Sequence, residues 1–92
     1  MSKHATHHAQ IARLKRIEGQ VGGLVRMIEE ERYCVDLLTQ VRAVIAALRK
    51  VELGVLKTHI DHCIRSAAET RDPVDVNRKV DELISVLDRY GR

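Results

Sequence analysis

Residues 34–63 read CVDLLTQVRAVIAALRKVELGVLKTHIDHC, and this stretch decides the fold. It holds no proline and one glycine, Gly54, and its apolar residues recur at alternating steps of four and three. The residues of this stripe are Leu37, Val41, Val44, Leu48, Val51 and Val55. Such a period is that of an amphipathic helix, so the sequence predicts one long helix that continues to about Thr70.

The two cysteines of the chain lie at the two ends of this stretch. His59 and Cys63 are four residues apart and share one helix face, as two ligands of one metal ion must. Cys34 is 29 positions from Cys63. That separation is roughly 40 Å along a straight helix, so Cys34 cannot join the other two within one chain. If two copies of the helix pack antiparallel, however, the dimer holds two equivalent sites, each with two thiolates and one imidazole.

Two further helices are predicted, one on each side of the long helix. Before it, apolar residues from Leu14 to Ile28 step by three and four, which is a heptad seam. After it, Asp72 and Pro73 form a helix start signal, a second apolar stripe follows, and Gly91 can end the helix. The predicted fold is all-α, with three helices per chain in a single domain of residues 1–92 that begins with a flexible tail of residues 1–8. Two chains would form an antiparallel four-helix-bundle core.

Several features of the 92-residue chain indicate that it does not fold alone. It has 45% hydrophobic residues but no Trp and no Phe, so Leu, Val, Ile and Ala must form the core. A helix of this length spans roughly 55 Å, more than one small domain can cover. Gly19, Gly22 and Gly23 lie inside the predicted first helix, where each costs about 1 kcal/mol of helix propensity. A neighbouring helix that approaches too closely for side chains would explain them.

No stretch of the sequence is apolar for long enough to be a signal peptide or a membrane span. We therefore expect a cytoplasmic protein without membrane contact. In that reducing compartment, two cysteines indicate metal binding or redox chemistry rather than a structural disulfide. The sequence contains neither a glycine-rich phosphate loop nor a nucleophile elbow, so it does not predict an enzyme.

The net charge of +3 is concentrated near the N-terminus. Between Met1 and Arg26, five Lys or Arg residues accompany one acidic residue, Glu18. This imbalance predicts a polyanionic partner, and without a known DNA-binding motif the contact would use a face of the helix bundle. The candidate phosphate-binding residues are Arg13, Lys15 and Arg16, with Arg42, Arg49, Lys50 and Lys57 on the long helix.

The ligand chemistry points to a soft metal ion. Two thiolates and one imidazole suit trigonal Cu(I), whereas Zn(II) or Ni(II) would need a fourth ligand. His62 is a weaker candidate because it points roughly 100° away from Cys63 around the helix. His4, His7 and His8 could fold over the site as additional ligands, so Ni(II) and Co(II) are alternative metals for this site.

These residues resemble the copper-sensitive operon repressor family, which also includes nickel/cobalt, formaldehyde and persulfide sensors. The resemblance covers nearly the whole chain and rests on three segments of the sequence. They are Arg13-Leu14-Lys15-Arg16-Ile17-Glu18-Gly19-Gln20-Val21, Arg32-Tyr33-Cys34-Val35-Asp36, and His59 with His62-Cys63.

The resemblance implies a bacterial repressor that forms a homotetramer from two dimers. Such a repressor binds operator double-stranded DNA as the apoprotein and leaves it when the inducer binds. By motif position, Cys34, His59 and Cys63 match the copper ligands. Tyr33 and Glu82 match residues that link the site to DNA release. The basic residues Arg13 and either Arg49 or Lys50 fall where DNA contacts lie.

Other functions compatible with the sequence use the same residues differently. A cytosolic copper buffer or chaperone would need the three ligands but no basic face. A persulfide-sensing repressor would use Cys34 and Cys63 as a redox pair and would have no need of His59. A Ni(II)- or Co(II)-responsive repressor would add N-terminal histidines to the ligand set.

Overall fold

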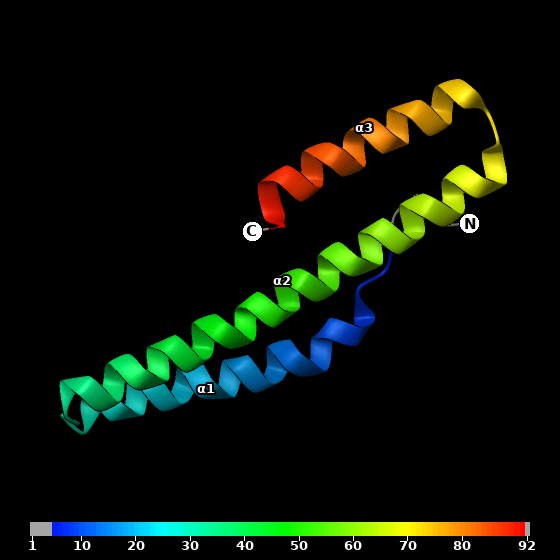
Figure 1. Cartoon of the computed structure of the whole chain (residues 1–92). Helices are drawn as coiled ribbons and strands as arrows, with labels where there is room; N and C mark the ends of the chain where they lie inside the picture. The colour runs from blue at the N-terminus through cyan, green and yellow to red at the C-terminus, as the bar shows by residue number, and fades with distance from the viewer. Residues whose placement is uncertain (1–4, 92) are drawn as a thin grey trace. The chain divides into compact units, whose positions relative to one another are not determined.

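The computed structural model describes residues 5–91, which form a 3-10 turn and three α-helices. The turn η1 spans His8–Gln10, and the helices are α1 (Ile11–Glu29), α2 (Cys34–Thr70) and α3 (Pro73–Tyr90) (Figure 1). The all-α prediction with three helices is confirmed, and α2 is one continuous helix that begins at Cys34. The chain divides into two compact units, His8–Glu52 and a second unit made of residues 5–7 and 53–91.

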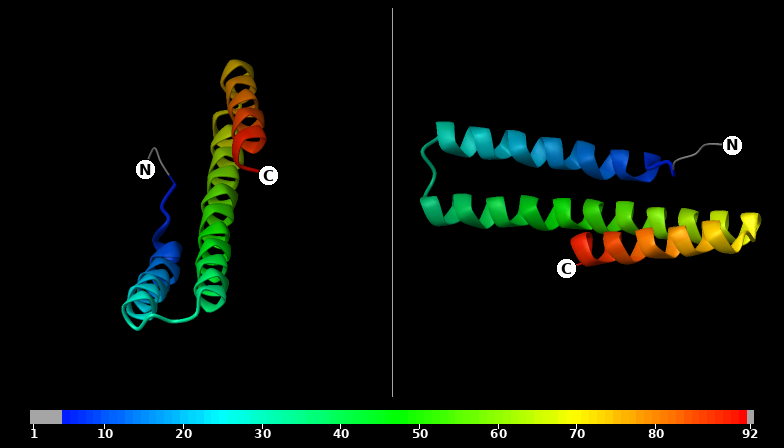
Figure 2. Two further views of the ribbon diagram at one scale, coloured as in Figure 1. Left: turned by 90° about the vertical axis from the view of Figure 1, so that its left-hand side faces the viewer. Right: turned by 90° about the horizontal axis from the view of Figure 1, so that it is seen from above.

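In the first unit, α1 runs antiparallel along the N-terminal part of α2 (Figures 1 and 2). Ile17 of α1 and Val44 of α2 are buried and belong to the two predicted apolar stripes. A hydrogen bond from the Arg13 guanidinium to the carbonyl oxygen of Lys50, 3.4 Å long, also joins the helices. Most other residues of the two stripes are exposed in the single chain, for example Ile28 and Val41, whereas Leu24, Leu37 and Val51 are half-buried.

In the second unit, α3 runs antiparallel along the C-terminal part of α2 (Figure 2). The start signal of α3 acts as predicted, because the Asp72 carboxylate accepts a hydrogen bond from the amide of Val74 at 3.1 Å and Pro73 occupies the first turn. The helix ends at Tyr90 and is capped by Gly91, whose amide donates to the carbonyl oxygen of Leu87 at 2.9 Å. Asp72 therefore sets where α3 begins relative to the end of α2.

Two charged residues, rather than glycines, adopt left-handed backbone after helices: Glu31 with φ 56° and Arg71 with φ 53°. After α1, the amide of Arg32 donates to the carbonyl of Met27 and that of Glu31 donates to Ile28. These two bonds form a Schellman motif, which satisfies carbonyls at the helix end. A side chain at such a position costs roughly 1–2 kcal/mol, so composition alone could not reveal this turn.

The glycines of α1 are not explained by the chain's own helices. A Cβ atom at Gly19 would meet nothing within 4 Å, and one at Gly22 or Gly23 would meet only the Arg26 guanidinium at 3.7 Å. The close helix neighbour predicted for them is thus absent from the described part of this chain, and a neighbour from another chain stays a prediction. Across residues 5–91, no helix combines the length and apolar character needed to cross a bilayer.

Candidate metal centre

His59 and Cys63 lie one turn apart on α2, where the helix packs against α3. Cys63 is only 6% exposed. Both residues line a cavity of about 360 Å³. The other lining residues are Ala5, His7, His62, Ser66, Lys79 and Glu82. The structure thus brings His62 and His7, two of the candidate additional ligands, to the same cavity as the predicted pair.

His59 faces Glu82 of α3. The Nε2 atom of His59 lies 3.3 Å from Oε1 of Glu82, within ion-pair distance. Nε2 is buried and has no well-aligned hydrogen bond to any described residue. The Glu82 carboxylate is the acidic group that lies within ion-pair distance of it. A metal ion bound at the other ring nitrogen, Nδ1, would leave Nε2 to donate its proton to Glu82, the arrangement usual for histidine ligands.

The Cys63 thiol sits in an environment that keeps it protonated without a metal. Burial raises the pKa of the Cys63 thiol, the negative charge of Glu82 raises it further, and the positive charge of Lys79 opposes the rise. The Sγ atom donates to the carbonyl oxygen of Lys79 at 3.9 Å. Since the thiolate is the metal ligand, a metal ion must displace the thiol proton and this hydrogen bond together.

The third predicted ligand, Cys34, is the first residue of α2 and is exposed, as is the preceding Tyr33. Within residues 5–91, no three His, Cys, Asp or Glu side chains of this chain come together as a metal cage. His59 and Cys63 are therefore not joined by a third such side chain from the described part of this chain. Of the N-terminal histidines, His7 has a buried Nδ1 without a hydrogen-bond partner among the described residues, His8 begins η1, and His4 lies outside the described residues.

Three of the seven basic candidates line a second cavity, of about 490 Å³, in the first unit. Its charged lining residues are Arg13, Arg16 and Lys50, and Ile17, Gln20, Ala43, Ala46 and Ala47 complete it. Lys15, Arg42 and Arg49 are exposed outside this lining, and Arg49 pairs with Glu52 at 3.4 Å. Lys57 is exposed in the second unit. Three cations converge on one hollow lined by small apolar residues, which is an arrangement suited to an anion.

The sequence reasoning missed three residues beside the cavity: Ser66, Asp75 and Lys79. Lys79 Nζ donates to Ser66 Oγ at 2.8 Å and to the Asp75 carboxylate at 2.9 Å. A signal was present, because Ser66 lies three residues after Cys63, and Lys79 and Asp75 lie three and seven residues before Glu82. These steps place polar residues on the same helix faces as the predicted site residues.

Residues 6–89 match the family model described as metal-sensitive transcriptional repressor, and the chain belongs to this family. The resemblance found in the sequence is thereby confirmed. The family is one of transcriptional repressors and not of enzymes.

Two relatives are copper-sensing transcriptional repressors. RicR of Mycobacterium tuberculosis is 52% identical over 61 residues, which are 66% of this chain and 64% of RicR. CsoR of Bacillus subtilis is 44% identical over 80 residues, which are 87% of this chain and 76% of CsoR. The match to RicR thus spans less than two thirds of that protein.

Two solved structures share the fold, and their titles name different metals. The nickel-responsive transcriptional regulator InrS is 34% identical, with a TM-score of 0.77 and coverage of 98% of this chain and 97% of InrS. The copper-sensing repressor CsoR with Cu(I) from Geobacillus thermodenitrificans is 35% identical, with a TM-score of 0.74. It aligns over 100% of this chain and 95% of CsoR. Proteins similar to this chain are thus named for copper and for nickel, so family membership does not identify the metal.

Proposed function

We propose that this protein is a cytoplasmic Cu(I)-responsive repressor whose apo form binds operator DNA and whose copper-bound form releases it. The observation that carries the proposal is the pairing of His59 with Glu82 across α2 and α3. His59 of α2 is a candidate ligand. Glu82 of α3 provides the carboxylate that lies beside the Nε2 atom of His59. A metal on Nδ1 would strengthen this contact, so metal occupancy would hold α3 more firmly against α2.

The metal site is shared between two chains. Cys34 and Cys63 begin and nearly end one continuous helix, and 29 residues of helix correspond to roughly 40 Å. Cys34 of one chain therefore completes the site formed by His59 and Cys63 of a second, antiparallel chain. Two thiolates and one imidazole then satisfy Cu(I) without further ligands.

The dimer is supported by the exposed apolar seam of the first unit. Its exposed members include Leu14, Val21, Val25 and Ile28 of α1, and Val41, Ile45 and Leu48 of α2. A contiguous seam of this kind on a small chain marks a protein-protein interface. Covering it with a second helix pair forms the antiparallel four-helix core, and two such dimers form the homotetramer.

Operator DNA is bound by the basic residues of the first unit. Arg13, Arg16 and Lys50 already converge on one cavity, and Lys15 and Arg49 extend the positive surface. Contacts of this kind neutralise phosphates and bind duplex DNA in a salt-dependent manner.

A Ni(II)- or Co(II)-responsive repressor is the second candidate, favoured by His7. This side chain lines the cavity of His59 and Cys63 and has an unpartnered, buried Nδ1. It would supply the fourth donor that Ni(II) needs and Cu(I) does not.

Anaerobic titration with Cu(I) and with Ni(II), while DNA binding is followed by fluorescence anisotropy, separates these functions. Cu(I) should release the DNA, and deletion of residues 1–8 should leave Cu(I) affinity nearly unchanged. Collapse of Cu(I) affinity on that deletion would favour the nickel or cobalt function. Metal binding without any DNA binding would indicate a copper buffer, and release by persulfide alone would indicate a persulfide sensor.

A further inference from the structure

The contacts between α2 and α3 form an ordered ladder. His59 faces Glu82, Cys63 donates to the Lys79 carbonyl, and Ser66 accepts from the Lys79 ammonium. The positions advance along α2 while they go back along α3, as antiparallel packing requires. Every step is three or four residues, so each set lies on one helix face.

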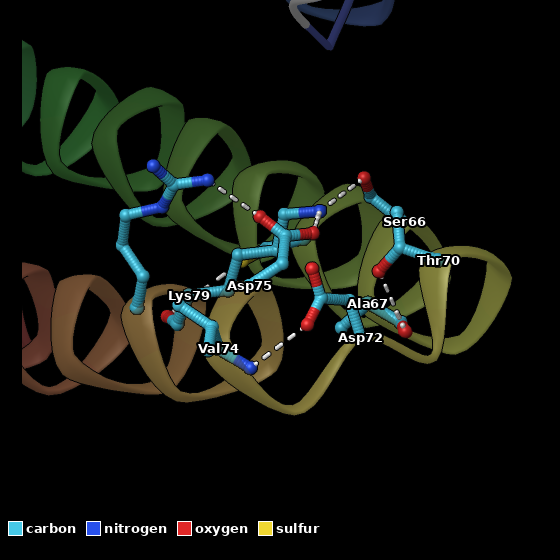
Figure 3. A network of polar contacts seen from close by, with 9 residues as sticks. Ser66, Ala67, Thr70, Asp72, Val74, Asp75 and Lys79 are labelled. Carbon is cyan, nitrogen blue, oxygen red and sulfur yellow. Dashed lines mark hydrogen bonds and ion pairs between the residues drawn. The ribbon is translucent and has the colours of Figure 1, made fainter.

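Lys79 is the central member of this ladder. Its ammonium reaches α2 through Ser66 Oγ at 2.8 Å and returns to its own helix through Asp75 Oδ2 at 2.9 Å (Figure 3). The Lys79 side chain is only 21% exposed, so water replaces these acceptors poorly. Hydrogen bonds with an ionised partner are short and strong. The Lys79 ammonium is ionised in both of its bonds, and in the bond to Asp75 the acceptor is ionised as well.

Asp75 is held in the ionised form that this bridge needs. Hydrogen bonds from Lys79 and from Arg78 lower the pKa of Asp75 below its usual value of 3.8. Lys79 and Arg78 both belong to α3, and Ser66 of α2 accepts from the same Lys79 ammonium. The bridge is therefore a cluster of groups drawn from both helices.

We propose that Lys79 is a positioning residue: by joining Ser66 of α2 to Asp75 of α3, it fixes the register of α3 and so holds Glu82 beside His59. Lys79 and Glu82 are one turn apart on α3, and Ser66 and His59 are two turns apart on α2. A slip of α3 by one turn moves Glu82 about 5.4 Å along the helix axis, out of reach of His59. It also separates the ammonium from Ser66.

The effect of Lys79 on DNA release depends on the proposed function, whereas its effect on the position of α3 does not. The first test therefore uses the apoprotein alone and follows amide hydrogen exchange in α3. Lys79→Met should speed exchange from Val80 to Leu87 about tenfold or more, the factor expected for the loss of one hydrogen bond to a charged group. Ser66→Ala removes only the α2 end of the bridge and should act in the same direction.

The matched control is Arg78→Met. Arg78 also binds the Asp75 carboxylate, at 2.8 Å, but its side chain is 77% exposed. It forms no contact with α2 in the described residues that would fix the register. Exchange in α3 should change less than about twofold in this variant, because an exposed ion pair contributes little. Ser66→Thr keeps the hydroxyl that Ser66→Ala removes, so exchange in α3 should stay at the parent rates in this variant. Equal exchange rates in Lys79→Met and Arg78→Met would overturn the proposal.

A second test asks whether Lys79 acts through Glu82. Lys79→Met should keep Cu(I) affinity within about tenfold and weaken the release of DNA by copper. The double variant Lys79→Met/Glu82→Gln should release DNA no more weakly than Lys79→Met alone. Additive losses in the double variant would contradict the proposal. If copper does not release DNA from the parent protein, the proposed function fails, and the exchange experiment still decides the role of Lys79.

Discussion

The two helix pairs of this protein, residues 8–52 and residues 53–91, are held together by different kinds of contact. Among its described residues the first pair buries two apolar side chains, Ile17 and Val44, and leaves most of its seam exposed. The second pair is joined by directional polar contacts, among them Lys79 with Ser66 and His59 with Glu82. An exposed apolar seam is a surface that a second chain can cover, whereas directional polar contacts are ones that a bound ion can strengthen or break. The first pair is thus suited to assembly and the second to sensing.

The largest effect is expected from a charge placed on the exposed seam of the first pair. Ile45 is 57% exposed in the single chain, and Ile45→Asp should raise the dimer dissociation constant at least about a hundredfold, because the dimer would bury an unpaired carboxylate. Analytical ultracentrifugation measures this. Val74→Asp, at a residue 76% exposed in the second pair, is the control and should stay dimeric. Equal dissociation of both variants would remove the distinction between the two pairs.

The next effect concerns a carboxylate in each pair. Glu82→Gln should abolish most of the coupling between copper and DNA, typically about 1–3 kcal/mol, while Cu(I) affinity stays within about tenfold. Glu52 has a similarly exposed carboxylate, paired with Arg49, and Glu52→Gln should keep the coupling. DNA anisotropy titrations with and without Cu(I) give both values. Parent-like release of DNA from Glu82→Gln would show that coupling runs by another route.

A smaller loss is expected at the cap of α3. Asp72→Ala removes the acceptor for the Val74 amide and should lower the local stability of α3 by about 1 kcal/mol. Hydrogen exchange should rise in α3 and not in α1. Asp61→Ala, which breaks only the exposed pair with Arg65, serves as the comparison and should change α3 much less.

The smallest effect is a dependence of α3 docking on acid pH. The pKa of Asp75 is lowered in the folded protein, so ionised Asp75 stabilises the docked α3. This stabilisation is complete when the pH is above 3.8, the usual pKa of an aspartate. It is lost as the pH falls through the lower folded pKa. NMR spectra of the α3 amides should therefore change in acid, and Asp75→Asn should show at neutral pH the loosened α3 that the parent reaches only in acid. An Asp75→Asn spectrum identical to that of the parent at neutral pH would contradict this role.

The helices were predictable because their signals are local. The period of the apolar stripe predicted α2, and Asp72-Pro73 predicted the start of α3. The turn after α1 was not predictable, because Glu31 takes a left-handed conformation that usually belongs to glycine. Its stability comes from hydrogen bonds rather than from residue type.

The candidate site was predictable in part for the same reason. His59 and Cys63 share a helix face by spacing, but the contact between His59 and Glu82 depends on how α3 packs on α2, which a one-helix pattern does not contain. Lys79 was missed because a lysine on a helix is ordinarily solvated, and only the packing shows its acceptors on two helices. Completion of the site by Cys34 stays a prediction.

The most direct test of the account is therefore subunit mixing. Cys34→Ala and His59→Ala chains are refolded together, and Cu(I) sites are counted under anaerobic conditions. A heterodimer regains one intact site, so random pairing should give about a quarter of the parent's sites, while each variant alone gives none. If the mixture regains no copper binding although both variants dimerise normally, the site is not shared between chains.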